Sequence, residues 1–96
     1  MSQTADTVIP LGQGARGLKG VVVQVGAAGS GSTLAAGELE RRLLEIGFVE
    51  GAVVEILHEG LLGGDPIAVK LDDARVALRR REALAVLVRV SAKEPT

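Results

Sequence analysis

The sequence predicts a small, mostly antiparallel β-barrel of about five strands, with one α-helix between the first two strands and a short helical turn before the last. Three observations lead to this prediction. Short segments rich in valine or in alternating apolar residues recur along the chain, as in half-buried strands. One amphipathic segment has the residue spacing of a helix. Glycine and aspartate residues separate these segments from one another.

Length and composition limit the classes of protein that the chain can represent. Its 96 residues suit one domain with a single modest core, and 47% hydrophobic against 24% charged residues is a balance typical of a folded chain. The net charge of -1 provides no general attraction to nucleic acid or to anionic lipid. The absence of cysteine excludes disulfides, thiolate catalysis and cysteine-based zinc sites.

The chain also lacks the features of an exported or membrane-spanning protein. The N-terminus has neither a basic region nor an apolar run, and no later apolar run approaches the length of a transmembrane helix. We therefore expect a cytoplasmic protein without direct membrane insertion. Residues 1–9 are predicted to form a flexible N-terminal tail, residues 10–90 the folded domain and residues 91–96 a C-terminal tail.

The best-defined segment, residues 39–51, is an amphipathic helix that ends at a glycine and leads into a strand. Its apolar face is formed by residues at three- and four-residue spacing: Leu39, Leu43 and Ile46. Gly47 is predicted to end the helix in the left-handed conformation, which costs other residues roughly 1–2 kcal/mol. Phe48 would then fold back onto Leu43, and Gly51 would provide the positive φ of a type II turn.

The remaining elements follow from alternation and from turn residues. The predicted strands span residues 21–25, 52–59, 65–71, 74–78 and 84–90, and residues 79–83 form the helical turn. Val54 and Ile56 are expected to face the core. A tight turn at Asp72 and Asp73 joins the third and fourth predicted strands into a hairpin. Pro66 is tolerated because a residue at the start of a strand need not donate a ladder hydrogen bond.

Residues 26–33 form a small-residue loop that has part of the pattern of a phosphate-binding loop. Gly26 and Gly31 have the required spacing and precede Ser32 and Thr33. The lysine that contacts the β- and γ-phosphates is missing, however, because Ser32 stands in its place. A flexible connector is therefore the favoured interpretation, and nucleotide binding is the alternative.

No residue pattern indicates catalysis or a bound cofactor. The only histidine, His58, has no evident nucleophile beside it, so a structural or solvent-edge role is favoured over a ligand or acid–base role. Asp65, Asp72 and Asp73 could hold a hard cation, but their positions at a strand start and in a hairpin turn explain them more simply. We predict no catalytic, cofactor-binding or metal-ligating residues and no cofactor.

An ordered set of residues provides a family resemblance. These residues are Leu44, Gly47, Gly51, the triplet Gly64, Asp65 and Pro66, the triplet Leu78, Arg79 and Arg80, and the pair Glu82 and Ala83. In order and spacing they resemble the FeoA family of small ferrous iron transport proteins, with a weaker match at Pro10, Leu11 and Gly14. The resemblance covers roughly residues 10–90 and implies structural roles for the motif residues.

The resemblance also implies an SH3-like barrel, a cytosolic location and a protein partner, the FeoB permease for ferrous iron with its cytoplasmic GTP-binding domain. The chain departs from the family at Glu50, where proline is frequent, and in the longer loop of residues 26–33. The expected function is a non-enzymatic accessory role in bacterial ferrous iron uptake, modulating the activity or assembly of the permease. The alternative is a stand-alone regulatory or peptide-binding module similar to the C-terminal domain of iron-dependent repressors.

The candidate docking residues are two leucines in a glycine-flanked loop, Leu61 and Leu62, because exposed apolar pairs mark interaction sites. An equally open alternative is that the loop folds over an open barrel end and buries both. Arg79 and Arg80 are further candidates, although a solvated basic face paired with Glu82 explains the arginine run more simply. The partner would be the permease or a second copy of this protein, and nucleic acid is not expected.

Overall fold

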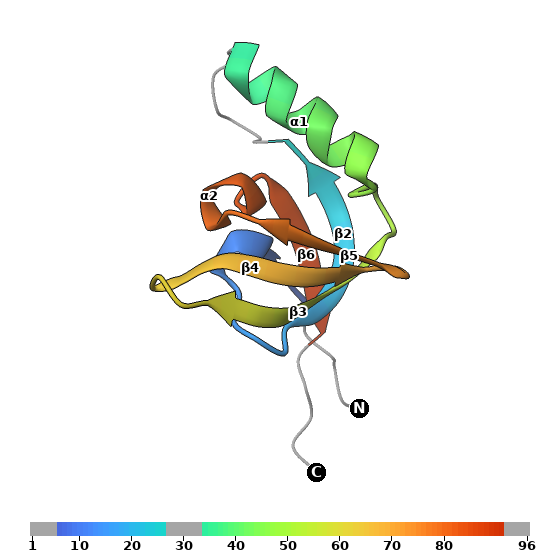
Figure 1. The fold of residues 1–96 in the computed structure, drawn as a ribbon. Coiled ribbons are helices and arrows are strands. Elements are labelled where there is room, and N and C mark those ends of the chain that lie inside the picture. Colours follow the sequence, from blue (N-terminus) through green and yellow to red (C-terminus); the bar gives the residue numbers. More distant parts are fainter. Residues whose placement is uncertain (1–5, 27–33, 92–96) are drawn as a thin grey trace, which may run out of the picture.

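The structure is a computed structural model that describes residues 6–26 and 34–91. Its six strands form one antiparallel sheet in the order β1-β6-β2-β3-β4-β5. The strands are β1 (Asp6–Pro10), β2 (Lys19–Val25), β3 (Val53–Gly60), β4 (Gly64–Leu71), β5 (Ala74–Leu78) and β6 (Val86–Ser91). The sheet curls so that β3, β4 and β5 cross β2 and β6 (Figure 1). Because β1 and β5 end the sheet without pairing to each other, the barrel is open.

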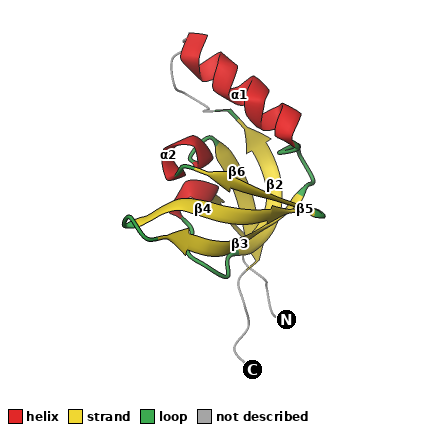
Figure 2. Ribbon diagram, viewed as in Figure 1, coloured by secondary structure: helices red, strands yellow, loops and turns green. Residues whose placement is uncertain are grey.

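Three helical segments accompany the sheet in the described part of the chain. Helix α1 (Leu34–Ile46) lies between β2 and β3 in the chain, the short helix α2 (Arg80–Ala83) precedes β6, and a 3-10 helix η1 (Leu11–Gln13) follows β1. Figure 2 shows α1 beside one end of the barrel and α2 next to η1. This arrangement confirms the predicted mostly β fold, with its helix after the first predicted strand and its helical turn before the last. Within the described ranges, no helix is long and apolar enough to cross a membrane.

Strand β1 was not predicted, and it begins inside the segment that we assigned to the N-terminal tail. Its sequence contains only two adjacent large apolar residues, Val8 and Ile9, so it shows no recognisable alternation. The strand is stabilised instead by pairing with β6, from Asp6 opposite Ser91 to Pro10 opposite Leu87. In residues 6–26 and 34–91 the domain therefore has six strands rather than about five.

The core lies between the two halves of the curled sheet. Its fully buried side chains include Val54 and Ile56 of β3, as the alternation predicted. The other large, fully buried residues come from η1, α1, the strands β2, β4 and β6, and the turn after α1: Leu11, Leu43, Phe48, Ile67, Val22, Val69, Val86 and Val88. Buried polar or charged residues are absent from this core as far as the structure describes it. Burial of apolar area is therefore the main contribution that holds the two halves of the curled sheet together.

The end of α1 has the predicted Schellman geometry. Gly47 has a φ of 127°. The N–H of Phe48 donates to the carbonyl of Leu43 at 3.0 Å, and the N–H of Gly47 donates to that of Leu44 at 3.1 Å. These bonds satisfy carbonyls that the end of the helix would otherwise leave unpaired. Phe48 is thereby returned to the core beside the buried Leu43.

The predicted apolar face of α1 is only partly buried. Leu43 is buried and Leu39 packs against the core, but Ile46 is 43% exposed. The difference arises because α1 lies at one end of the barrel rather than across the sheet (Figure 2), so only part of its apolar stripe reaches the core.

Two predicted turns are confirmed. Gly51 has a φ of 93°, and the N–H of Ala52 donates to the carbonyl of Val49 at 2.9 Å, as in a type II turn. The β4–β5 hairpin closes through Asp72 and Asp73, and Asp72 has a φ of 51°. Each turn therefore lies where its residues predicted it.

We expect Gly47→Val to lower the free energy of unfolding by at least about 2 kcal/mol, since valine is strained at positive φ and β-branching adds to that strain. A Cβ at this position would also lie 3.2 Å from Cδ2 of Leu71. Urea unfolding measures the loss. Function should change only through stability, so a variant that unfolds like the parent but no longer binds its partner would show that the helix end is itself an interface.

Candidate docking site

The tip of the β3–β4 hairpin presents the two candidate leucines to solvent. Leu61 is 101% exposed and Leu62 is 82% exposed, the highest values among the large apolar residues described. The alternative that the loop folds over the barrel end and buries them is therefore wrong. A fully exposed pair of leucines makes this tip the candidate docking site.

The turn itself gives no reason for leucine at these positions. Gly60 pairs with Gly64, so residues 61–63 form a three-residue turn. Gly63 has a φ of 70° and is the last residue of the turn. Three-residue turns commonly have a left-handed residue at this last position. The two positions before it accept most residues and in solvent are usually polar. Leu61 and Leu62 are thus not required by the local backbone.

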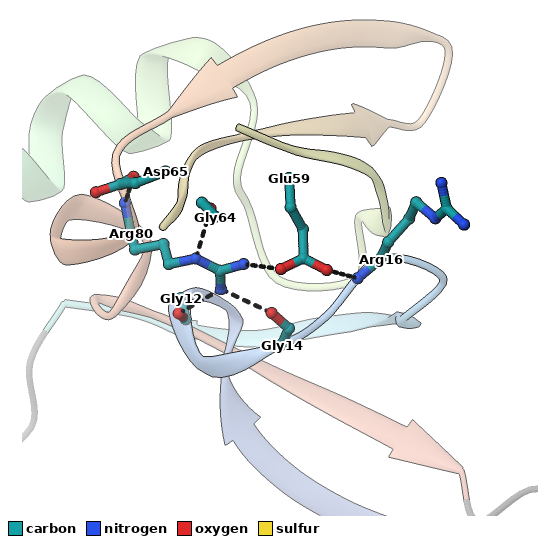
Figure 3. A network of polar contacts seen from close by, with 7 residues as sticks. All are labelled: Gly12, Gly14, Arg16, Glu59, Gly64, Asp65 and Arg80. Atoms are coloured by element: carbon teal, nitrogen blue, oxygen red, sulfur yellow. Dashed lines mark hydrogen bonds and ion pairs between the residues drawn. The ribbon is translucent and has the colours of Figure 1, made fainter. Parts of the chain in front are cut away.

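The base of this tip is held by Arg80, which projects from α2 (Figure 3). Its Nε donates to the carbonyl of Gly64 at 2.8 Å, and its Nη2 donates to Oε1 of Glu59 at 2.7 Å. Its Nη1 donates to the carbonyls of Gly12 at 3.0 Å and Gly14 at 2.7 Å. The side chain is only 22% exposed, so the guanidinium is committed to contacts within the domain.

Two further bonds extend the network. The second carboxylate oxygen of Glu59 accepts from the main-chain N–H of Arg16 at 2.9 Å, and Oδ1 of Asp65 accepts from the main-chain N–H of Arg80 at 2.8 Å. Figure 3 shows these groups converging from η1 and its following loop, β3, β4 and α2. Because Glu59 precedes the tip and Gly64 follows it, Arg80 holds both stems of the hairpin.

The interpretation of the arginine run as a solvated face paired with Glu82 is wrong for Arg80. Arg79 and Arg81 are exposed. Glu82 accepts from the main-chain N–H of Arg79 at 3.1 Å, and its ion pair is with Arg42 of α1 at 3.2 Å. No local pattern separates Arg80 from its neighbours, so the sequence could not identify it as the residue that turns inward.

Part of the motif, from Gly64 to Pro66 and from Leu78 to Ala83, lies in this region. Gly64 and Asp65 bind Arg80 directly, and Leu78 and Ala83 are buried on either side of it in the chain. The Asp65-Pro66 peptide bond is cis. Leu44, in contrast, is 42% exposed on α1 and lies outside the network. Arg80 therefore belongs to the scaffold that positions the tip, whereas Arg79 remains available at the surface.

The structure places the other candidate residues at exposed positions. His58 is exposed, and Oδ1 of Asp72 accepts from the N–H of Val53 at 3.0 Å, which is a turn role. Asp73 is exposed in the same turn. In residues 6–26 and 34–91, no three His, Asp or Glu side chains gather as a metal site would require. The glycine-rich loop of residues 26–33 falls outside the described residues after Gly26.

A small hollow lies on the outer face of the sheet. It has a volume of about 90 Å³ and is lined by Lys19, Val53, Glu55, Lys70 and Asp72. Its charges are mixed in sign, and it is far smaller than the roughly 300–1,000 Å³ of typical small-molecule sites. The tip of the β3–β4 hairpin is therefore the more distinctive feature for binding.

Solved structures of similar proteins share this fold. The chain is 29% identical to FeoA from Chlorobium tepidum, over 91% of this chain and 74% of that chain, with a TM-score of 0.70. It is 32% identical to FeoA from Stenotrophomonas maltophilia, over 81% of this chain and 86% of that chain, with a TM-score of 0.61. That protein was crystallised with zinc and is described as a prokaryotic SH3 domain protein, proposed to act as a ferrous iron transport activating factor.

A manganese-dependent transcriptional repressor also matches, with 24% identity and a TM-score of 0.69 over 92% of this chain and 44% of that chain. At this identity the likeness shows the fold alone. None of the curated proteins matches the chain. The FeoA domain family matches residues 9–90, which contain the hairpin tip, the Arg80 network and every motif residue named above. The SH3-like barrel and the family resemblance are thereby confirmed, and the chain belongs to the FeoA family.

Proposed function

We propose that this protein is a non-enzymatic accessory factor of ferrous iron uptake that binds the cytoplasmic GTP-binding domain of the FeoB permease. The exposed tip of the β3–β4 hairpin is the observation that carries the proposal. The membership of the FeoA family supports the link to ferrous iron transport. In this proposal the protein acts on the cytoplasmic side, and Leu61 and Leu62 enter an apolar pocket of the permease domain.

The energetics of the tip favour a binding role. Complete burial of one leucine side chain stabilises a complex by roughly 1.5–3 kcal/mol, so the pair can supply a large part of a micromolar affinity. Arg80 holds the main-chain carbonyl after the tip and the carboxylate before it. A turn that is already fixed loses less conformational entropy on binding than a mobile one.

Modulation of the permease requires differential binding. A partner shifts an equilibrium between two states only when it binds one state more tightly than the other. The proposed mechanism is that the tip recognises one conformation or assembly of the GTP-binding domain. GTP hydrolysis by the permease would then change with the concentration of this protein.

The double variant Leu61→Ser/Leu62→Ser tests the docking site. We expect its affinity for the purified GTP-binding domain to fall roughly a hundredfold, since two buried leucines contribute at least about 3 kcal/mol. Its free energy of unfolding should stay within about 0.5 kcal/mol of the parent, because both side chains are exposed in the free protein. Isothermal titration calorimetry and urea unfolding measure the two quantities.

Leu44→Ser is the matched control because Leu44 is a partly exposed leucine on α1 rather than on the hairpin. It should leave affinity for the permease domain unchanged. Equal loss of affinity in the control and the double variant would mean that the tip is not the contact. A parent protein that does not bind the domain at all would reject the proposed function itself.

A further inference from the structure

The outer edge of β5 is an unpaired sheet edge. In the described part of the chain, β5 pairs with β4 alone and ends the sheet. Arg75 and Ala77 are exposed there, and no other described residue hydrogen-bonds to their main chain outside the β-ladder. Such an edge is a template for another strand. The other edge strand, β1, ends at Pro10, which has no N–H to donate.

The hairpin register determines which main-chain groups point outward. Leu71 and Ala74 flank the two-residue turn, so they form the pair that exchanges both hydrogen bonds. Bonded and non-bonded pairs alternate along an antiparallel ladder. Val76 and Leu78 therefore direct their N–H and C=O groups toward β4. Arg75 and Ala77 direct theirs away from it, toward the open edge.

We propose that β5 pairs antiparallel with β5 of a second copy of this protein, about a two-fold axis at Val76. Arg75 of one copy then lies opposite Ala77 of the other, and the reverse holds by symmetry. Each such pair exchanges two N–H to C=O bonds, so the four outward-facing groups of each copy are all satisfied. The two six-stranded sheets become continuous.

The side chains fit this register on the outer face. Arg75 lies opposite Lys70 within the domain, and Ala77 lies opposite Ala68. In the paired sheets the long Arg75 side chain would cross two small residues of the second copy, Ala77 and Ala68. Like charges directly opposite each other would oppose pairing, and this register places an arginine opposite an alanine instead.

The core-facing side of the same strand fits as well. Val76 is only partly buried, although it packs against the core. Two-fold pairing places it opposite Val76 of the second copy, which covers the exposed remainder of both side chains. Pairs of β-branched residues at this position favour strand association. The strand is complementary to itself on both faces, and this favours a second copy over an unrelated peptide.

Ala77→Pro tests the proposal, with Ala77→Ser as its matched control. Proline removes the outward N–H but no bond to β4, and edge strands tolerate it; serine keeps the N–H and a small side chain. We expect sedimentation equilibrium to show a monomer–dimer equilibrium for the parent and the serine variant. The dimer dissociation constant should rise at least tenfold in the proline variant. A parent that stays monomeric at millimolar concentration, or a proline variant that dimerises like the serine variant, would overturn the proposal.

Amide hydrogen exchange of the unmodified protein gives a second test that does not depend on how the variants fold. At concentrations above the dissociation constant, the Arg75 and Ala77 amides should exchange at least tenfold more slowly than in dilute protein. The amides of Val76 and Leu78, bonded to β4, should be slow at both concentrations. Concentration-dependent protection elsewhere, with none at Arg75 and Ala77, would place the contact on another surface and reject this one.

Discussion

Arg80→Met is expected to lower the free energy of unfolding by roughly 3 kcal/mol, because hydrogen bonds to a charged group contribute about 1.5–3 kcal/mol each and several are lost together. Methionine fills a similar length of space but leaves the carbonyls of Gly12, Gly14 and Gly64 and the carboxylate of Glu59 without their donor. Partial solvent access to the site keeps the loss below the sum of the four bonds. Urea unfolding measures the loss.

Two variants separate the contribution of the Arg80 hydrogen bonds to stability from that of its positive charge. Arg81→Met removes an exposed arginine of the same run and should change the free energy of unfolding by no more than about 0.5 kcal/mol. Arg80→Lys keeps the charge but not the planar fork of donors, so it should recover only a minor part of the loss. If Arg80→Met and Arg81→Met unfold at the same urea concentration, the Arg80 network does not contribute to the free energy of unfolding.

Gly12→Ala is expected to destabilise the protein by about 3 kcal/mol or more. This is the opposite of the usual effect, because alanine normally stabilises an ordered backbone more than glycine does. Gly12 is buried in η1, and its position next to α2 leaves no room for a Cβ. A Cβ would overlap the carbonyl oxygen of Arg80 and lie 2.9 Å from the nitrogen of Leu84. Main-chain atoms cannot move aside as a flexible side chain can, so η1 and α2 must separate.

Gly37→Ala is the matched control, and its effect should have the opposite sign. Gly37 lies within α1, and a Cβ there meets no atom within 4 Å. Alanine should raise the free energy of unfolding by roughly 0.4–1 kcal/mol, because it restricts the unfolded chain and suits a helix. Urea unfolding of the two variants side by side checks both signs. A neutral Gly12→Ala would mean that η1 and α2 are not in close contact.

The Arg80 network also gives a physical reason for the spacing of the family motif. Arg80 follows the end of β5, and Gly64 and Asp65 open β4, so the hairpin between them brings the two triplets together. Gly12 and Gly14 reach the same guanidinium from the other end of the chain. The two triplets, together with Gly12 and Gly14, therefore describe how α2, β4 and η1 are joined beneath the exposed tip.

Local chemistry in the sequence predicted much of the fold. Gly47 and Gly51 have the positive φ values expected of them, because a helix end and a type II turn demand this of a few adjacent residues. Val54 and Ile56 are buried as their alternation predicted, because alternate residues of a strand face opposite sides. These features depend on residues close together in the chain.

Tertiary structure decided the features that depend on distant residues. Strand β1 exists because β6 pairs with it from the other end of the chain, and its own five residues carry too little pattern to show this. Ile46 belongs to the apolar stripe of α1 but remains exposed because the helix lies at the barrel end.

The candidate site divides in the same way. The sequence by itself identified Leu61 and Leu62 as candidates, since an apolar pair between glycines has no local explanation. It did not determine whether the two side chains are exposed or buried. Only the fold shows that the turn points into solvent. It likewise selects Arg80 from three consecutive arginines, because the residue that turns inward is the one whose donors reach Gly12, Gly14, Glu59 and Gly64. Those acceptors come together only when β3, β4 and η1 are in place.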